Sequence, residues 1–171
     1  MAAAALALAT GADEDGPRLR PWAGGPTPSL AGTELSGRPF DLRALRGQAV
    51  LVQFWASWCE PCRDELPALA GLVARLRGRP FGLVTVNLGE ARSRAERFLA
   101  EAGVVLPTLL DPERKAGKAW GVQGLPMAFL VDAGGNVRSW IFGEVDWSAG
   151  PAAGELEALV QDAERRQGKV D

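Results

Sequence analysis

The residues of this sequence best suited to chemistry are its only two cysteines, Cys59 and Cys62, in the segment FWASWCEPC (residues 54–62). Two thiols with this spacing can form and break a disulfide, and their thiolates can also hold a soft ion such as copper(I). A C-x-x-C pair near the first turn of a helix is more often redox-active than structural. We therefore predict a thiol-disulfide exchange site.

The flanking segments predict how the cysteines are held. Residues 49–55 are almost unbroken apolar sequence, which is typical of a strand buried on both faces. In residues 59–76 apolar side chains recur every three or four positions, which predicts a helix with one apolar face. Cys59 would lie at the helix N-terminus, where unpaired N–H groups stabilise a thiolate, and Cys62 one turn later. We expect Cys59 to be the exposed nucleophile and Cys62 the shielded, resolving thiol.

Composition excludes several classes of function. The chain has 171 residues, 47% of them apolar, which suits one globular domain. Its net charge of −2 argues against nucleic acid as a partner. The absence of histidine excludes Cys-His catalysis and any His-ligated metal or haem, and two cysteines do not make a tetrahedral zinc site. We expect no metal and no cofactor.

The N-terminal 28 residues differ from the rest of the chain in composition and lack its periodic apolar pattern. Residues 1–9 are rich in Ala and Leu and look like the remnant of a secretory signal peptide, although no basic residue precedes them. The alternative is an Ala-rich disordered arm. Residues 10–28 mix acids, Gly and Pro and are expected to form a flexible lead-in, in which Trp22 is either packed or exposed. The folded domain is predicted over residues 29–167.

Further elements follow from the same patterns. We expect a short hairpin over 30–40, a strand parallel to the central one over 81–88, a helix over 91–102 and a short strand or extended piece over 104–111. A helix is predicted over 112–120, with Asp111 as N-cap and Pro112 in the first position. Residues 127–131 and 137–142 should form a hairpin, and 152–166 a closing helix.

Four segments together resemble the TlpA/ResA/CcmG-like thiol-disulfide oxidoreductases of the thioredoxin superfamily. They are FWASWCEPC (54–62), ELP (65–67), GVQGLP (121–126) and FLVD (129–132). The resemblance implies a three-layer α/β/α thioredoxin fold with a central mixed sheet. It also implies an N-terminal β-hairpin extension beside the sheet and a strand-helix insertion between the two halves of the fold.

Further residues near the cysteines are candidates for the site, and some of them also have a simpler structural interpretation. Glu65 shares the helical face of Cys62 and could move a proton for the resolving thiol, as the resemblance also implies, or it could merely complement the helix N-terminus. Trp58 is either a shelf for a partner chain or a packing residue. The resemblance implies that Pro126 is cis and that the backbone of Leu125 binds an extended substrate strand.

The leading hypothesis is a monomeric, periplasmic enzyme that reduces disulfides of exported proteins. The resemblance implies that its substrates include those of cytochrome c maturation and that its electrons come from a membrane thiol donor. The acid-rich, His-free surroundings favour a reductant, because they stabilise a thiolate poorly. The alternatives are a general cytosolic thioredoxin and a copper(I)-handling protein. An assay of insulin-type disulfide reduction, run beside a titration with copper(I), distinguishes these hypotheses.

Overall fold

The computed structural model describes residues 17–169, so the expected signal peptide over 1–9 lies outside the described residues. In chain order the elements are β1 (Arg20–Pro21), β2 (Ala31–Thr33), β3 (Pro39–Asp41), the 3-10 helix η1 (Leu42–Leu45), β4 (Ala49–Trp55), α1 (Glu60–Arg75), β5 (Phe81–Leu88), α2 (Arg92–Glu101), β6 (Thr108–Asp111), α3 (Lys115–Ala119), β7 (Met127–Val131), β8 (Val137–Phe142) and α4 (Gly150–Gln167).

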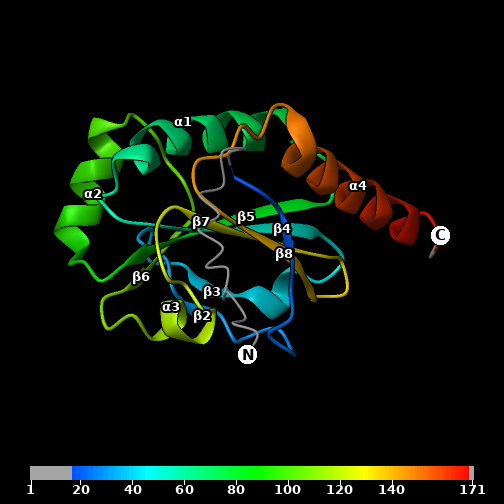
Figure 1. Ribbon diagram of the computed structural model, residues 1–171, viewed down its shortest axis with the longest axis horizontal. Coiled ribbons are helices and arrows are strands. Elements are labelled where there is room, and N and C mark those ends of the chain that lie inside the picture. The colour runs from blue at the N-terminus through cyan, green and yellow to red at the C-terminus, as the bar shows by residue number, and fades with distance from the viewer. Residues whose placement is uncertain (1–16, 170–171) are drawn as a thin grey trace, which may run out of the picture.

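Six strands form one mixed sheet in the order β1-β8-β7-β4-β5-β6. The central strand β4 runs parallel to β5 and antiparallel to β7, and all seven of its residues are buried. Figure 1 shows α1, α2 and α4 above the sheet and α3 with the β2–β3 hairpin below it. The predicted three-layer α/β/α thioredoxin fold is therefore confirmed.

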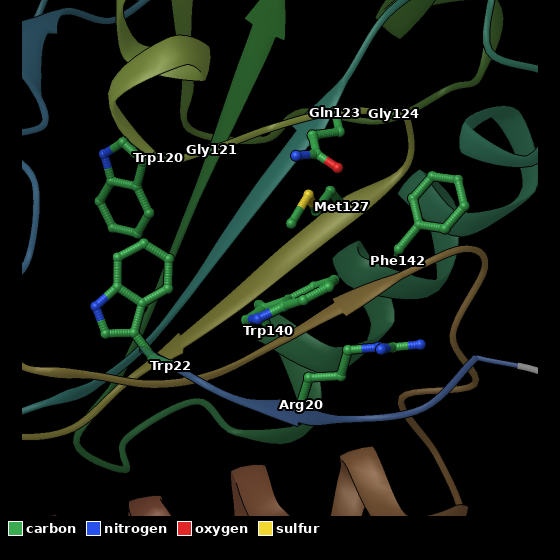
Figure 2. Close-up of a pocket in the computed structure, with 9 residues that line it drawn as sticks. All are labelled: Arg20, Trp22, Trp120, Gly121, Gln123, Gly124, Met127, Trp140 and Phe142. Atoms are coloured by element: carbon green, nitrogen blue, oxygen red, sulfur yellow. The ribbon is translucent and has the colours of Figure 1, made fainter. Parts of the chain in front are cut away.

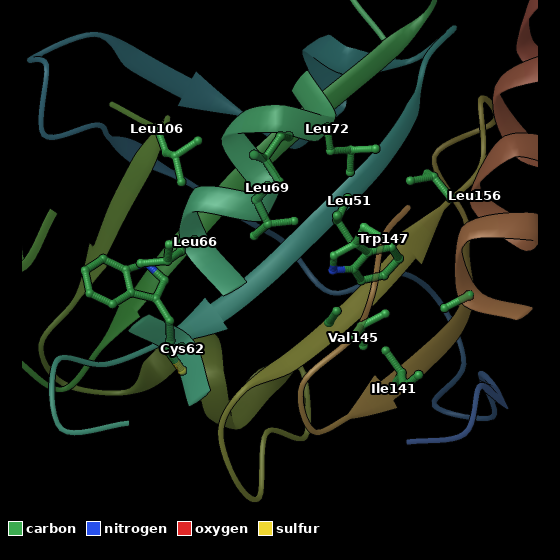
Figure 3. Close-up of a cluster of buried hydrophobic side chains, with 14 of the residues drawn as sticks. Leu51, Cys62, Leu66, Leu69, Leu72, Leu106, Ile141, Val145, Trp147 and Leu156 are labelled. Carbon is green, nitrogen blue, oxygen red and sulfur yellow. The ribbon is translucent and has the colours of Figure 1, made fainter. Parts of the chain in front are cut away.

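Two apolar clusters, one on each face, hold the layers together. The cluster under α1, α2 and α4 includes Leu51 of β4, Leu69 of α1 and Leu156 of α4, which Figure 3 shows converging between helix and sheet. The opposite cluster includes Phe54 of β4, Phe129 and the fully buried Trp120. Because alternate residues of β4 point to opposite faces, this one strand supplies both clusters.

Two features, the helix α3 and the β2–β3 hairpin, differ from the sequence-based expectation. The helix predicted over 112–120 begins only at Lys115, and Asp111 is not its N-cap. Asp111 instead accepts a hydrogen bond from the backbone N–H of Gly117 at 2.8 Å, inside the helix. The β2–β3 hairpin exists but forms its own two-stranded sheet, and an isolated bridge from Glu34 to Leu109 links it to β6.

The segment expected to be a flexible lead-in is partly built into the domain. Arg20 and Pro21 pair with β8, and the Trp22 ring packs edge-on against Phe129 with centroids 5.9 Å apart. The indole N–H of Trp22 donates to the carbonyl of Gly25 at 2.8 Å. Composition could not reveal this packing, because a single aromatic anchor outweighs the polar sequence around it.

We expect Trp22→Ala to lower the free energy of unfolding by about 1–2 kcal/mol, because it removes the ring contact with Phe129 and exposes apolar surface. Chemical denaturation measures this change. Val105→Ala serves as the control, since Val105 is 98% exposed and its truncation should change little. Equal small effects of the two substitutions would show that the segment around Trp22 adds no stability.

Candidate active site

The two cysteines form a disulfide at the start of α1. Cys59 is the N-cap residue, with extended backbone angles, and Cys62 lies in the first turn. Their Cα atoms are 5.3 Å apart. The strand-turn-helix placement predicted for the pair is confirmed. Because β4 ends at Trp55, the turn after it carries Cys59 to the helix N-terminus at the edge of the sheet.

The exposure predicted for Cys59 differs from what the structure shows. In the disulfide form Cys59 is 4% exposed and Cys62 1%, so both residues are buried. Both belong to the apolar cluster beneath α1, and that packing covers Cys59 as well. The order of exposure agrees with the prediction, but the difference is small, and the nucleophilic role of Cys59 stays a prediction.

The two tryptophans before the cysteines have different surroundings. Trp58, the neighbour of Cys59 in sequence, is 59% exposed, so it does not pack in the core. Its role as a surface for a partner chain stays a prediction. Trp55 is fully buried and stacks on Phe98 with centroids 5.2 Å apart. Its indole N–H donates to the hydroxyl of Thr85 at 3.1 Å. Trp55 therefore belongs to the core, as the sequence predicts.

Glu65 lies one turn after Cys62 and is buried, with 2% of its surface exposed. Trp147 Nε1 donates to its Oε1 at 3.0 Å, and Gln53 Nε2 donates to its Oε2 at 3.1 Å. Burial raises the pKa of Glu65 to about 7, even though these two donors and a backbone hydrogen bond from Val145 favour the ionised form. The group is thus poised to gain or lose a proton near neutral pH.

This burial distinguishes Glu65 from the other acids of the helix. Glu60 and Asp64 are exposed on α1, as expected of groups that only complement the helix N-terminus. Glu65 is not such a solvated acid, because the sheet and the loop before α4 enclose it. Its function in proton transfer stays a prediction.

A second buried carboxylate, missed in the sequence, holds the turn before the cysteines. Glu90, which is 8% exposed, accepts hydrogen bonds at 2.8 Å from the Ser57 backbone N–H and from Asn87 Nδ2, and it also accepts from the Ser57 hydroxyl. These bonds keep the pKa of Glu90 below its usual value despite the opposing effect of burial. Glu90 lies two residues after the end of β5, so its place at the same sheet edge as Cys59 could have suggested it.

Two further residues that sequence reasoning missed surround Glu65. Gln53 is the only strongly polar residue in the apolar run of β4, and that exception was a usable signal. Trp147 comes from the segment between β8 and α4, far away in sequence, and no local pattern marks it. Arg75 of α1 donates to the Trp147 carbonyl at 2.7 Å and so fixes this segment against the helix.

The Leu125–Pro126 peptide bond is cis, as the resemblance implied. The backbone N–H of Gly143 donates to the Pro126 carbonyl at 2.9 Å, which ties this loop to the end of β8. Leu125 is half-buried and packs against both apolar clusters. Substrate binding by the Leu125 backbone stays a prediction.

An aromatic pocket of about 480 Å³ lies next to this loop, on the face of the sheet opposite α1. In Figure 2 the rings of Trp22, Trp120, Trp140 and Phe142 surround Met127, with Gln123 at the rim. The guanidinium of Arg20 lies over the Trp140 ring, 5.5 Å from its centroid. Sequence analysis did not anticipate this pocket, because its four rings come from three separate segments.

Comparisons with known proteins agree with this geometry. The profile of the AhpC/TSA family matches residues 23–140. The chain belongs to the AhpC/TSA family. Thiol-disulfide oxidoreductase ResA of Bacillus subtilis is 32% identical over 120 residues, which span 70% of this chain and 67% of ResA. ResA of Geobacillus thermodenitrificans is also 32% identical, over 70% of this chain and 69% of that relative.

Among solved structures, a thiol:disulfide interchange protein of the thioredoxin family from Chlorobium tepidum is 30% identical to this AhpC/TSA family protein. It superimposes with a TM-score of 0.66 over 84% of this chain and 97% of that chain. The family, the fold and the Cys59–Cys62 disulfide together make this chain a thiol-disulfide oxidoreductase of the ResA-like type.

The raised pKa of Glu65 predicts a pH-dependent stability. Its pKa is about 7 in the folded protein against a usual 4.5, so the folded state binds more protons between these values. The free energy of unfolding should therefore fall as pH rises from about 4.5 to 7, by about 3 kcal/mol at most. Denaturant unfolding at several pH values measures this, and the lack of histidine keeps other titrations in this window few.

Glu65→Gln should flatten this dependence, because the amide keeps the shape of the side chain but does not titrate. Asp64→Asn is the matched control on the exposed side of the same helix and should keep the slope of the parent. A slope that survives in Glu65→Gln would assign the pH dependence to other groups.

Proposed function

We propose that this oxidoreductase works outside the cytoplasm as a reductant of disulfides in exported proteins, including those of cytochrome c maturation. The observation that carries the direction of electron flow is the buried Glu65 carboxyl, one helical turn from Cys62. A strong oxidant stabilises its thiolate with nearby positive groups. A buried acid beside the resolving thiol does the opposite, so the dithiol gives up its electrons readily.

The reaction begins with attack by the Cys59 thiolate on one sulfur of a substrate disulfide. The other substrate sulfur leaves as a thiolate, and a mixed disulfide joins Cys59 to the substrate. The Cys62 thiolate then attacks the Cys59 sulfur and expels the second substrate thiolate. The enzyme's two thiols are oxidised to the Cys59–Cys62 disulfide while the substrate disulfide is reduced by two electrons.

Glu65 is suited to manage the proton of Cys62. The resolving thiol must lose its proton before it attacks, and bulk water has little access because both cysteines are buried. A carboxyl whose pKa is about 7 can accept that proton at neutral pH and release it later. Trp147 and Gln53 act as positioning residues here, since each donates to one oxygen of the carboxyl.

The substrate would bind as an extended strand along the Leu125 backbone, beside the cis Pro126, with the exposed Trp58 as an apolar support. A membrane thiol donor would reduce the enzyme again, and the enzyme would act as a monomer. Residues 17–169 include no helix that is long and apolar enough to cross a bilayer.

The reduction potential tests the direction of electron flow. We expect a value at or below that of thioredoxin, about −270 mV, because acidic groups disfavour the thiolates that stabilise a reduced pair. Equilibration with glutathione or dithiothreitol buffers, followed by counting of free thiols, gives the potential. A value near −120 mV, typical of the oxidant DsbA, would overturn the proposal.

Kinetics of Glu65→Gln test the proton-transfer role. We expect the plateau of the rate of disulfide resolution to fall by about 10²-fold, because general base catalysis of the Cys62 thiol is lost. Stopped-flow reduction of a model disulfide from about pH 5 to pH 9 measures it, provided that the variant unfolds like the parent. A profile that shifts along the pH axis with an unchanged plateau would leave Glu65 only an electrostatic effect.

A further inference from the structure

A hollow of about 510 Å³ opens between α1 and α2, directly beside the active-site turn. Three arginines line it, Arg63 from α1 and Arg94 and Arg97 from α2, together with Ser57 of the turn and Phe98. We call this hollow the arginine groove. Its three guanidinium groups stand out in a chain whose net charge is −2.

Two of the guanidinium groups are held in place. Arg94 Nε donates to the Ser57 hydroxyl at 3.0 Å and lies 3.4 Å from the buried carboxylate of Glu90. The guanidinium of Arg63 lies over the Phe98 ring, 4.6 Å from its centroid. Such contacts reduce the rotamer entropy that a ligand would otherwise have to freeze.

The groove keeps positive charge in excess after its internal pairs are counted. Glu90 is buried against Arg94, while Glu101 reaches Arg63 only at 3.9 Å with both side chains about half-exposed, which makes a weak pair. Within residues 17–169, Arg97 forms no ion pair. One guanidinium is thus fully available, and a second is largely so.

The N-terminus of α2 adds to the positive potential of the groove. Its N-cap, Ala91, makes no side-chain hydrogen bond, and Ala91 and Ser93 both line the groove. The first N–H groups of the helix therefore lack a side-chain acceptor and carry partial positive charge toward the groove. Carboxylates are the natural complement, because a guanidinium can bind both oxygens of one carboxylate.

We propose that the arginine groove binds acidic residues of the protein whose cysteine pairs with Cys59. This rests on the proposed function, because it assumes that a polypeptide disulfide reaches Cys59. Ser57 lies two residues before Cys59 and also lines the groove. Residues that flank a cysteine bonded to Cys59 are therefore expected to come within reach of the arginines, while the bonded segment itself lies along Leu125. The groove thus selects among substrates by charge.

A pair of model substrates tests this. Two peptides of one length carry the same disulfide to a small chromophoric thiol, one with three Asp residues beside the cysteine and one with three Asn residues. At low ionic strength we expect kcat/KM of the reduced parent enzyme to be about three- to tenfold higher for the acidic peptide. In 0.5 M salt the ratio should approach one, because exposed charges are screened.

Charge-reversal variants locate the effect. Arg63→Glu combined with Arg97→Glu should bring the ratio of the acidic to the neutral peptide to one or below. The matched control is Arg77→Glu combined with Arg165→Glu, which changes the net charge equally at exposed positions at or beyond the C-terminal ends of α1 and α4. This control should keep the ratio of the parent.

Equal rates for the two peptides with the parent enzyme would overturn the arginine groove while leaving the proposed function intact. A ratio that falls as much in the control as in the groove variant would also overturn it, since net charge alone would then explain the preference. Reduction of neither peptide would overturn the groove and the proposed function together.

Discussion

The burial of β4 on both faces is the constraint on which the rest of the structure depends. Its seven residues feed two apolar clusters, and the cluster beneath α1 can close only if the helix lies along the strand. The packing of α1 on β4 then fixes the path of the turn between them, and Cys59 becomes the N-cap of the helix. A slip of one residue in β4 would move Gln53 and Trp55 to the opposite face and separate Gln53 from Glu65.

The same packing explains how a carboxyl comes to lie in the core. Glu65 occupies the apolar face of α1, where desolvation opposes its ionised form. The donors Trp147 and Gln53 offset part of that cost. Among the described residues, no donor reaches the Oε1 atom of Gln53. The hydrogen bond that its side chain makes is the one from Nε2 to the Glu65 carboxyl. A buried oxygen without a hydrogen-bond donor lowers the stability of an ordinary core, and such atoms are expected mainly at functional sites.

The fold and the cysteine pair could be predicted because their signals are local. The apolar run of β4, the helical period of α1 and the turn residues after Val131 each act through neighbours in sequence. The resemblance supplied the cis Pro126, which local sequence alone would not. The partners of Glu65 could not be predicted, because Trp147 is 82 positions away and its approach depends on tertiary packing. The packing of Trp22 was missed for the same reason, because its contact with Phe129 is distant in sequence. The late start of α3 was missed because Asp111 accepts from the backbone N–H of Gly117 and does not cap a helix at residue 112.

The negative and the positive groups of the site differ in burial: Glu65 lies in the core, whereas the arginines of the groove lie at the surface. If Glu65 acts on Cys62 as proposed, it does so at short range through a poorly polarisable core, where a single charge has a large effect. The arginines near Ser57 lie in water, where their field weakens within about 10 Å at moderate salt. Positive charge can therefore attract an acidic partner to the groove without stabilising the buried Cys62 thiolate to the same degree. An enzyme with this arrangement can favour acidic substrates and still remain a reductant, because the two effects act through different dielectric surroundings.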